Sequence, residues 1–343
     1  MNNSSVTDYL TVMSANIIRD GVIGNTMMLL TAILGLCMSS AQLMTIFLWK
    51  PLRDMQQTLV INAAAADASK SITYMFPALK RLCLAAMGRD EVIDQFDCMF
   101  WVFPLTVTTL YGLSSVLTLS LERLVVIAAP IWYWKHNRAF TRVLCCISCA
   151  LSLISGLGMF IGASKERLML SCNLMSSTTI EYYMFLVYFQ DVTTGGIIVT
   201  NIATGLLLVR RWRKAVRARE NMTVFKREIQ FNAIKAVFSV VALCLISFFA
   251  GMIFMTTIQD LDLPTKAFYG PFWGCLQMMR GVFDFGLWLL FSKKYRIGFE
   301  VVFLKCHCTK KNRVAPVLIE MGLGLHIQPY SHHLRASFRK ADV

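Results

Sequence analysis

Apolar residues in this chain form long blocks, and charged residues fall mostly between the blocks. Each block approaches the roughly 20 residues that a helix needs to cross about 30 Å of hydrocarbon. This pattern predicts membrane-spanning helices over residues 22–48, 58–82, 97–128, 142–163, 181–209, 232–257 and 268–291. We therefore expect an all-α membrane protein, a seven-transmembrane helix bundle.

A different pattern follows the seventh block. Aromatic side chains recur at every fourth position, with lysine and arginine between them: Phe291, Tyr295, Phe299 and Phe303. This spacing places the rings on one face of a short helix that lies in the membrane interface. The expected organisation is an extracellular amino terminus over 1–21, the bundle over 22–291, an amphipathic interfacial helix over 292–305 and a basic cytoplasmic tail over 306–343.

The composition agrees with a protein surrounded by lipid. Hydrophobic residues make up 56% of the 343 residues and charged residues 16%, against about 45–50% and about 25% in soluble domains. The net charge of +14 raises the question of a nucleic-acid partner. The basic residues, however, gather in short segments between the blocks and in the tail, which in membrane proteins reports orientation and contact with anionic lipid. We expect no nucleic-acid partner.

Loop charge also predicts the orientation. Basic residues follow the first, third and fifth blocks, whereas acidic residues precede the third block and follow the sixth. The positive-inside rule then places the amino terminus outside and the carboxyl terminus in the cytoplasm of a multi-pass plasma-membrane protein. Overlapping glycosylation sequons at Asn2 and Asn3 agree with this, although such triplets also arise by chance.

Two pairs of cysteines have candidate roles. Cys98 opens the third block and Cys172 precedes the fifth, both on the predicted oxidising side, where a disulfide is stable. Cys83 is an alternative partner. Cys306 and Cys308 directly follow the predicted interfacial helix, where thiol acylation would add a membrane anchor. The alternative for that pair is two free cytosolic thiols.

The third block carries a motif of a known receptor family. Glu122-Arg123-Leu124 ends the block, and Pro130 follows shortly after it. Together with Cys98 at the start of the block, these residues resemble the rhodopsin-like (class A) family of G-protein-coupled receptors, which has Asp/Glu-Arg-Tyr at this place. The resemblance implies a switch in which Arg123 pairs with Glu122 at rest and its release lets the sixth helix move outward. The alternative is a purely structural Arg123.

Other blocks carry more divergent versions of the family's motifs. Asn62-Ala63-Ala64-Ala65-Ala66-Asp67 is similar to Asn-Leu-Ala-x-Ala-Asp, so Asp67 corresponds to the family's buried acid. Cys244-Leu245-Ile246-Ser247-Phe248-Phe249 resembles Cys-Trp-x-Pro-Phe-Phe with the tryptophan and proline replaced, and Asp284-Phe285-Gly286-Leu287-Trp288 stands in the place of Asn-Pro-x-x-Tyr. This divergence leaves an invertebrate peptide receptor or chemoreceptor as a candidate subgroup.

The buried acid leads to a hypothesis about a fixed cation. In this receptor family the acid commonly holds a sodium ion in the resting state. Arg280 and Asp284 lie one helical turn apart, on the face that the resemblance turns toward Asp67. We expect the Arg280 guanidinium to replace sodium between the two carboxylates. The alternative is that Arg280 points elsewhere and binds backbone carbonyls.

The same resemblance restricts the ligand. Leu105 occupies the position of the aspartate that binds biogenic amines, and Met278 occupies that of the lysine that binds retinal. The polar candidates for the ligand pocket are Lys70 and Gln277, and Lys70 has the alternative of pairing with Asp67. A peptide or another small organic ligand is therefore expected.

The expected function is conversion of extracellular ligand binding into activation of a heterotrimeric G protein, with anionic inner-leaflet lipid as a further partner. No phosphate-binding loop, zinc-ligand spacing or nucleophile motif is present in the sequence, so we expect neither an enzyme nor a cofactor. One alternative is a seven-helix transporter with a polar path formed by Asp67, Lys70, Asp191, Arg280 and Asp284. Another is a constitutive or decayed receptor, because the prolines that kink the sixth and seventh helices are missing.

Overall fold

The computed structural model describes residue 19 and residues 21–53, 58–89, 92–162, 168–169, 172, 177–217 and 263–304. Within these ranges the long helices are α2 (Val22–Leu48), α4 (Thr58–Met87), α5 (Gln95–Ala128), α6 (Pro130–Leu157), α8 (Ile180–Arg217) and α10 (Leu263–Phe291). The predicted helix over 232–257 lies outside the described residues.

The short elements connect or follow these helices. They are α3 (Lys50–Arg53), the 3-10 helix η1 (Gly158–Phe160), the strands β1 (Ile93–Asp94) and β2 (Leu168–Met169), α11 (Lys293–Phe299) and the π-helical η2 (Glu300–Leu304). The chain divides into two compact units, Met1–Phe299 and Glu300–Val343. Every long helix and every site discussed below belongs to the first unit.

Part of the described helical structure has the length and composition that a bilayer requires. Four of the described segments are long and apolar enough to cross a membrane: Val22–Leu48, Gln95–Ala128, Pro130–Phe160 and Ile180–Arg211. Large apolar side chains lie exposed along them, for example Leu30 on α2 and Val199 on α8. In water such surfaces would be costly, whereas lipid tails solvate them.

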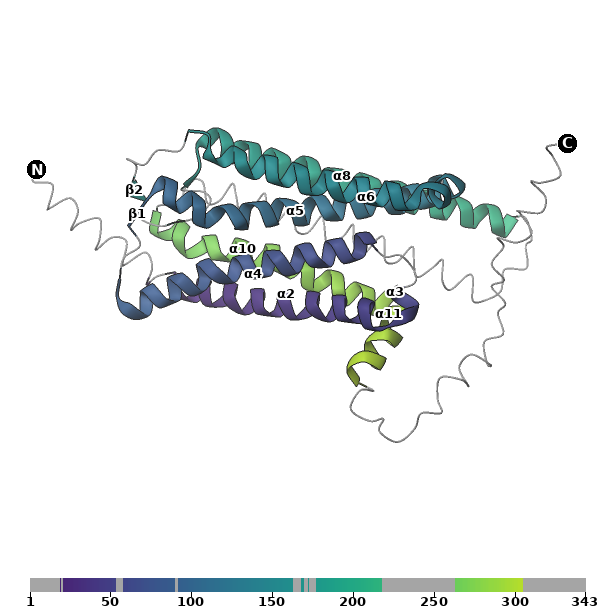
Figure 1. The fold of residues 1–343 in the computed structure, drawn as a ribbon, viewed down its shortest axis with the longest axis horizontal. Coiled ribbons are helices and arrows are strands. Elements are labelled where there is room, and N and C mark those ends of the chain that lie inside the picture. Colours follow the sequence, from purple (N-terminus) through teal and green to yellow (C-terminus); the bar gives the residue numbers. More distant parts are fainter. Residues whose placement is uncertain are drawn as a thin grey trace, which may run out of the picture. The chain divides into compact units, whose positions relative to one another are not determined.

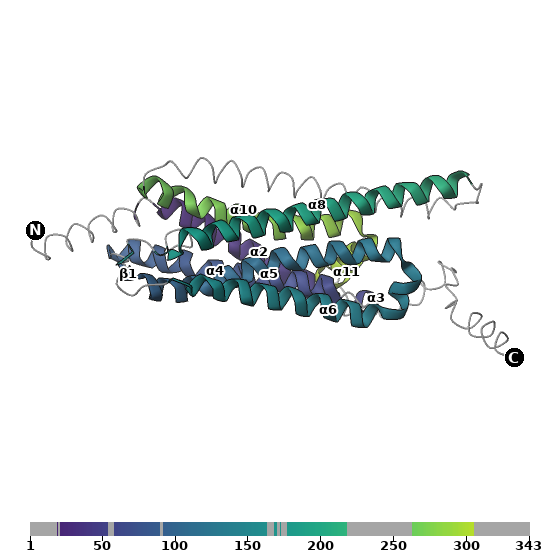
Figure 2. The ribbon, with the colours of Figure 1, turned by 90° about the horizontal axis from the view of Figure 1, so that it is seen from above.

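α5 is the central helix of the first unit. It contacts α4, α6 and α8, while α2 contacts α4 and α10 on the other side (Figures 1 and 2). Small residues let these helices approach closely, as membrane helices commonly do. A Cβ atom built on Gly156 of α6 would lie 2.4 Å from Cγ2 of Val107 on α5, and one built on Gly35 of α2 would lie 2.8 Å from Oγ of Ser71 on α4. A larger residue at either position would have to displace a side chain of the neighbouring helix.

The start of α5 is held by contacts with β2 and with Ser177. Asp94 caps the helix by accepting a hydrogen bond from the Asp97 amide at 2.8 Å, which satisfies one of the free amides of the first turn. β1 pairs with β2 in antiparallel register, with Ile93 opposite Met169. The buried Gln95 side chain donates to the Ser177 carbonyl at 2.7 Å. This end of the helix is therefore held by several contacts beyond its own backbone.

The largest differences in extent from the sequence-based prediction are in α6 and α8. α6 begins at Pro130 rather than at residue 142, so the expected loop with Lys135, Arg138 and Arg142 is helical, and that part of the prediction was wrong. Proline suits the first turn of a helix, because its fixed φ angle is helical and its missing amide would be unpaired there. α8 also continues past residue 209 to Arg217.

The segment after α10 forms a helix over Lys293–Phe299, which is followed by η2. Tyr295 is fully buried in a cluster with Ile46, Leu52 and Val60, and burial raises the pKa of its phenol. A Cβ atom on Gly298 would meet the Trp49 ring at 2.5 Å, so α11 packs directly against the end of α2. The placement of this helix in the membrane interface stays a prediction.

Candidate functional site

An ion pair between two largely buried side chains lies on α4. Asp67 and Lys70 of α4 are three residues apart and therefore share one face of the helix. Their Oδ1 and Nζ atoms lie 3.3 Å apart, and the side chains are 15% and 6% exposed. A charge at this depth is costly unless it is paired, so each residue provides the partner that the other requires.

The Lys70 ammonium also binds α10. Its Nζ donates to the backbone carbonyl of Gln277 at 3.0 Å, and the neighbouring Ser71 hydroxyl donates to the sulfur of Met278 at 3.7 Å. A Cβ atom on Gly281 would lie 3.2 Å from Cγ of Asp67, so the α10 backbone directly contacts the acid. Lys70 is therefore a fixed cation that joins α4 and α10, which is the alternative considered for it above.

The predicted triad includes two residues whose side chains are not described, Arg280 and Asp284. Both lie on α10, the helix whose Gly281 contacts Asp67. The carboxylate of Asp67 already has the Lys70 ammonium as a counter-ion. The triad with Arg280 stays a prediction, and its premise that Asp67 needs a cation from α10 is weakened.

A second polar network joins α4 and α5 through Asn62. Its amide nitrogen donates to the Ser115 hydroxyl at 3.0 Å, and its amide oxygen accepts a hydrogen bond from the Tyr111 hydroxyl. Further along the same interface, the Thr73 and Thr108 hydroxyls share a hydrogen bond of 2.8 Å. Satisfied buried polar groups fix the register of two helices more sharply than apolar contacts do.

The Glu122-Arg123 motif lies at the far end of α5 from the disulfide described below, and α6 and α10 contribute its partners. The Tyr133 hydroxyl on α6 donates to Oε1 of Glu122. The Arg123 guanidinium lies over the ring of Trp288 on α10, at 5.1 Å from the ring centroid, which is within the range of a cation–π contact. The predicted switch residues therefore contact two neighbouring helices.

Trp288 continues this set of contacts toward α11. Its ring packs on the Tyr295 ring with centroids 5.1 Å apart. Phe285, one turn earlier, is buried and meets the Phe299 ring edge-on at 5.8 Å. The predicted seventh-helix motif residues Phe285 and Trp288 therefore join Arg123 of α5 to the helix that follows α10.

An asparagine of α8 contacts α5 at Ser120, one turn before the motif. The buried Asn201 donates to the Ser120 hydroxyl at 3.0 Å and to its own helix at Ile197. Its amide oxygen has no hydrogen-bond partner in the described part of the chain. α8 is thereby attached to α5 close to Arg123, and sequence reasoning missed this contact because one buried asparagine gives no recognisable pattern.

The opposite end of α5 carries the disulfide. Cys98 and Cys172 are bonded, with Cα atoms 5.4 Å apart and a separation of 74 positions in the sequence. Cys83, the alternative partner, is a free and exposed thiol. The Arg81 guanidinium donates to the Cys172 carbonyl, and Lys80 lies 5.0 Å from the Trp101 ring centroid. The end of α4 therefore contributes two cations beside the disulfide.

The predicted ligand-pocket residues fall into two groups. Leu105 and the buried Met278 pack in an apolar cluster with Met28 and Tyr74. Lys70 and Gln277 bind each other as described. Several other predicted residues lie outside the described part of the chain, so nothing bears on their roles: Cys244, Leu245, Ser247, Phe248, Phe249, Cys306, Cys308, Asn2 and Asn3.

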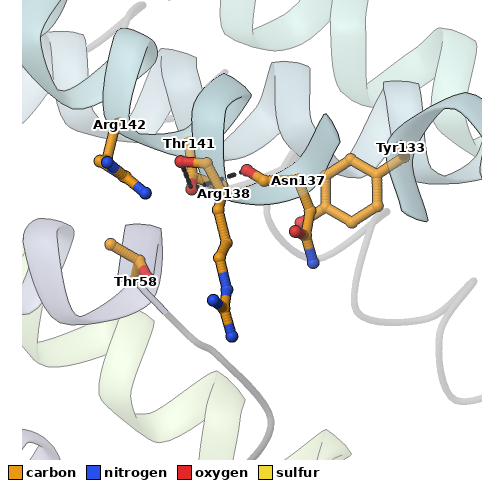
Figure 3. A pocket seen from close by; sticks show the side chains of 6 residues that line it. All are labelled: Thr58, Tyr133, Asn137, Arg138, Thr141 and Arg142. Atoms are coloured by element: carbon orange, nitrogen blue, oxygen red, sulfur yellow. Dashed lines mark hydrogen bonds between the residues drawn. The ribbon is translucent and has the colours of Figure 1, made fainter. Parts of the chain in front are cut away.

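A cavity that the sequence did not predict lies between α4 and the start of α6. It has a volume of about 320 Å³ and is lined by Thr58, Tyr133, Asn137, Arg138, Thr141 and Arg142 (Figure 3). Sequence reasoning missed it because residues 130–141 were expected to form a loop. As part of α6, Arg138 and Arg142 are one turn apart and lie on the same face of the helix.

Comparison with known proteins identifies the family. The family described as 7 transmembrane receptor (rhodopsin family) matches residues 40–282, more than two thirds of the chain. Comparison with individually curated proteins gave no match. The matched range begins inside α2, ends inside α10 and includes the helix expected over 232–257. This confirms the predicted seven-transmembrane fold, a multi-pass protein of the plasma membrane, and a receptor rather than an enzyme. The chain belongs to the rhodopsin family of seven-transmembrane receptors.

Proposed function

We propose that this receptor converts binding of an extracellular ligand into activation of a heterotrimeric G protein, with Glu122 and Arg123 as the switch. The observation that supports this most directly is the set of contacts around the motif. Glu122 is bound by Tyr133 of α6, and Arg123 lies over Trp288 of α10. Two charged residues of one helix are thus attached to two different helices.

These contacts have the strength that a reversible switch requires. A cation–π contact contributes about 0.5–2 kcal/mol, and a hydrogen bond to a charged group about 1.5–3 kcal/mol. Coupling between an effector site and a distant response is typically about 1–3 kcal/mol. An agonist that binds the active conformation tens of times more tightly can therefore release Arg123 from Trp288.

We propose the orientation with the amino terminus outside and the carboxyl terminus in the cytoplasm. The disulfide supports it, because stable disulfides belong to oxidising compartments and Cys98 lies at the opposite end of α5 from Arg123. The 34 residues of α5 span about 50 Å, enough to place the two ends on opposite sides of the membrane. Glycosylation of Asn2 and Asn3 and acylation of Cys306 and Cys308 are expected from this orientation.

The ligand is proposed to be a peptide or small organic molecule, and neither an amine nor retinal. Leu105 and Met278 offer apolar surface where those ligands require a carboxylate or an amine. Lys80 and Arg81, beside the disulfide, favour a ligand with an anionic group at the outer end of the bundle.

Guanine-nucleotide exchange tests the proposed function. Membranes that carry the receptor are screened with peptide and metabolite libraries for loading of a GTP analogue onto a panel of G proteins. Arg123→Ala is expected to reduce ligand-stimulated loading about tenfold or more, because loss of about 1.4 kcal/mol of coupling is already tenfold. Arg89→Ala is the matched control, since it removes an exposed arginine that follows α4.

The result separates the receptor from its main alternative. Loading that responds to a ligand and depends on Arg123 supports a G-protein-coupled switch. Absence of loading with every G protein, together with substrate flux across the same membranes, would instead indicate a transporter that uses the buried charges around Asp67.

A further inference from the structure

The cavity between α4 and α6 has the chemistry of an anion-binding site. Its lining contains two guanidinium groups, the hydroxyls of Thr58, Tyr133 and Thr141, and the amide of Asn137. No acidic residue lines it in the described part of the chain. Figure 3 shows the Arg138 and Arg142 side chains reaching from α6 toward the side on which Thr58 lies.

The two arginines are available to a ligand. Neither guanidinium has a hydrogen bond or an ion pair to another residue among those that the structure describes. Arginine offers a planar set of donors that matches phosphate geometry. Two guanidinium groups one helical turn apart can therefore bind the oxygens of one phosphate group from two directions.

The surroundings of the cavity indicate that lipid reaches it. The first two turns of α6 expose large apolar side chains: Ile131 is 87% exposed and Trp134 is 83% exposed. Trp132 is also exposed and stacks on the His136 ring at 5.1 Å. Tryptophan is enriched where a membrane protein meets the headgroup region. The start of α6, which lines the cavity, therefore fits the interface region where lipid headgroups lie.

We propose that this cavity binds the headgroup of a membrane lipid that carries a phosphate monoester, such as a polyphosphorylated inositol lipid. A monoester phosphate has a charge of about −1.5 to −2 at neutral pH, which the two guanidinium groups neutralise. The headgroup of phosphatidylserine fits less well, because its ammonium group would face the same two cations. The inositol ring hydroxyls find partners in Thr58 and Asn137.

The occupant would also contact the switch. Tyr133 lines the cavity and donates its hydroxyl to Glu122. A headgroup held by Arg138 and Arg142 therefore lies next to the residue that binds the switch carboxylate. This consequence rests on the proposed function, whereas binding of the headgroup itself requires neither a ligand nor a G protein.

Binding is tested with the full chain in phosphatidylcholine nanodiscs, which expose both faces of the bilayer. The probe is a phosphatidylinositol bisphosphate with a fluorescent acyl chain. The double variant R138Q/R142Q is expected to lower its affinity at least tenfold, because it removes both charge-assisted contacts to the phosphate group. The matched control R210Q/R211Q removes two exposed arginines of α8 and should change the affinity less than about twofold.

A second, milder variant distinguishes loss of the binding site from loss of the fold. Thr58→Val keeps the shape of an exposed residue and should lower the affinity about two- to fivefold through one lost hydrogen bond. Equal losses in R138Q/R142Q and R210Q/R211Q would overturn the proposal in favour of diffuse surface charge. Unchanged binding in R138Q/R142Q would also overturn it.

Competition identifies the source of the phosphate. Unlabelled inositol bisphosphate lipid should displace the probe, whereas phosphatidylserine should not. Displacement by soluble inositol trisphosphate at the same concentration as the lipid would overturn the assignment to a membrane lipid. Absence of lipid binding in every nanodisc would overturn the proposal and would favour an acidic segment of a protein partner as the occupant.

Discussion

At the scale of single residues, the Asp67–Lys70 pair is the most informative feature of this receptor. The resemblance to its family predicted a buried acid at Asp67, and the structure adds the ammonium group 3.3 Å away. An acid that is paired with a lysine of its own helix does not need a diffusible counter-ion. We therefore propose Lys70 as a fixed cation in place of sodium, and the predicted role of Arg280 between Asp67 and Asp284 stays a prediction.

Replacing Lys70 with methionine tests this role. The change leaves the Asp67 carboxylate buried without its partner, so the free energy of unfolding should fall by about 3–5 kcal/mol. The double variant Asp67→Asn with Lys70→Met should recover much of that loss, because no buried charge remains. Thermal unfolding in nanodiscs measures both variants.

Sodium provides a second readout for the same variants. The unmodified receptor should unfold at the same temperature in sodium and in potassium, whereas Lys70→Met should be stabilised by sodium because Asp67 is then open to a cation. A clear effect of sodium on the unmodified receptor would contradict Lys70 as the fixed cation.

At the scale of elements, close helix contacts depend on glycine. Gly156 of α6 leaves no room for a Cβ atom, because the nearest atom, Cγ2 of Val107, would be 2.4 Å away. Valine is stiff at χ1 and cannot turn aside easily. The α5–α6 contact would therefore have to widen if any side chain were added at this position.

Gly156→Ala should lower the free energy of unfolding by about 1–3 kcal/mol through overpacking. Gly195→Ala on α8 is the matched control, because a Cβ atom there meets nothing within 4 Å. That control should be neutral, or stabilising by up to about 1 kcal/mol, since alanine favours a helix over glycine. Equal unfolding temperatures for the two variants would contradict this, because the α5–α6 contact would then accommodate a methyl group with no loss in the free energy of unfolding.

The elements also show where sequence reasoning succeeds. Long apolar blocks bounded by charges place helices well, and α2 spans the range that its block predicted, Val22–Leu48. The start of α6 was missed because polar residues such as Lys135 and Arg138 resemble a loop, whereas Pro130 indicates a helix start. The side-chain partners of Glu122 and Asp67 were harder to predict, because they depend on how neighbouring helices are rotated.

At the scale of the whole molecule, the Cys98–Cys172 bond constrains a long stretch of chain. The cysteines are 74 residues apart in sequence, and a loop of that size is costly to close without a covalent link. Replacing both cysteines with serine should lower the free energy of unfolding by about 2–5 kcal/mol. Cys83→Ser, which changes an exposed free thiol, should have no measurable effect on thermal unfolding.

The joint between α5 and α6 has a mechanical consequence. α5 ends at Ala128 and α6 begins at Pro130, so a single residue, Ala129, separates them. Its amide donates to the Val125 carbonyl of one helix at 2.9 Å, and its carbonyl accepts from the Tyr133 amide of the other at 3.0 Å. A linker of one residue, hydrogen-bonded to both helices, does not let the two helices move independently. Rotation of α5 about its own axis must therefore move the first turn of α6 with it.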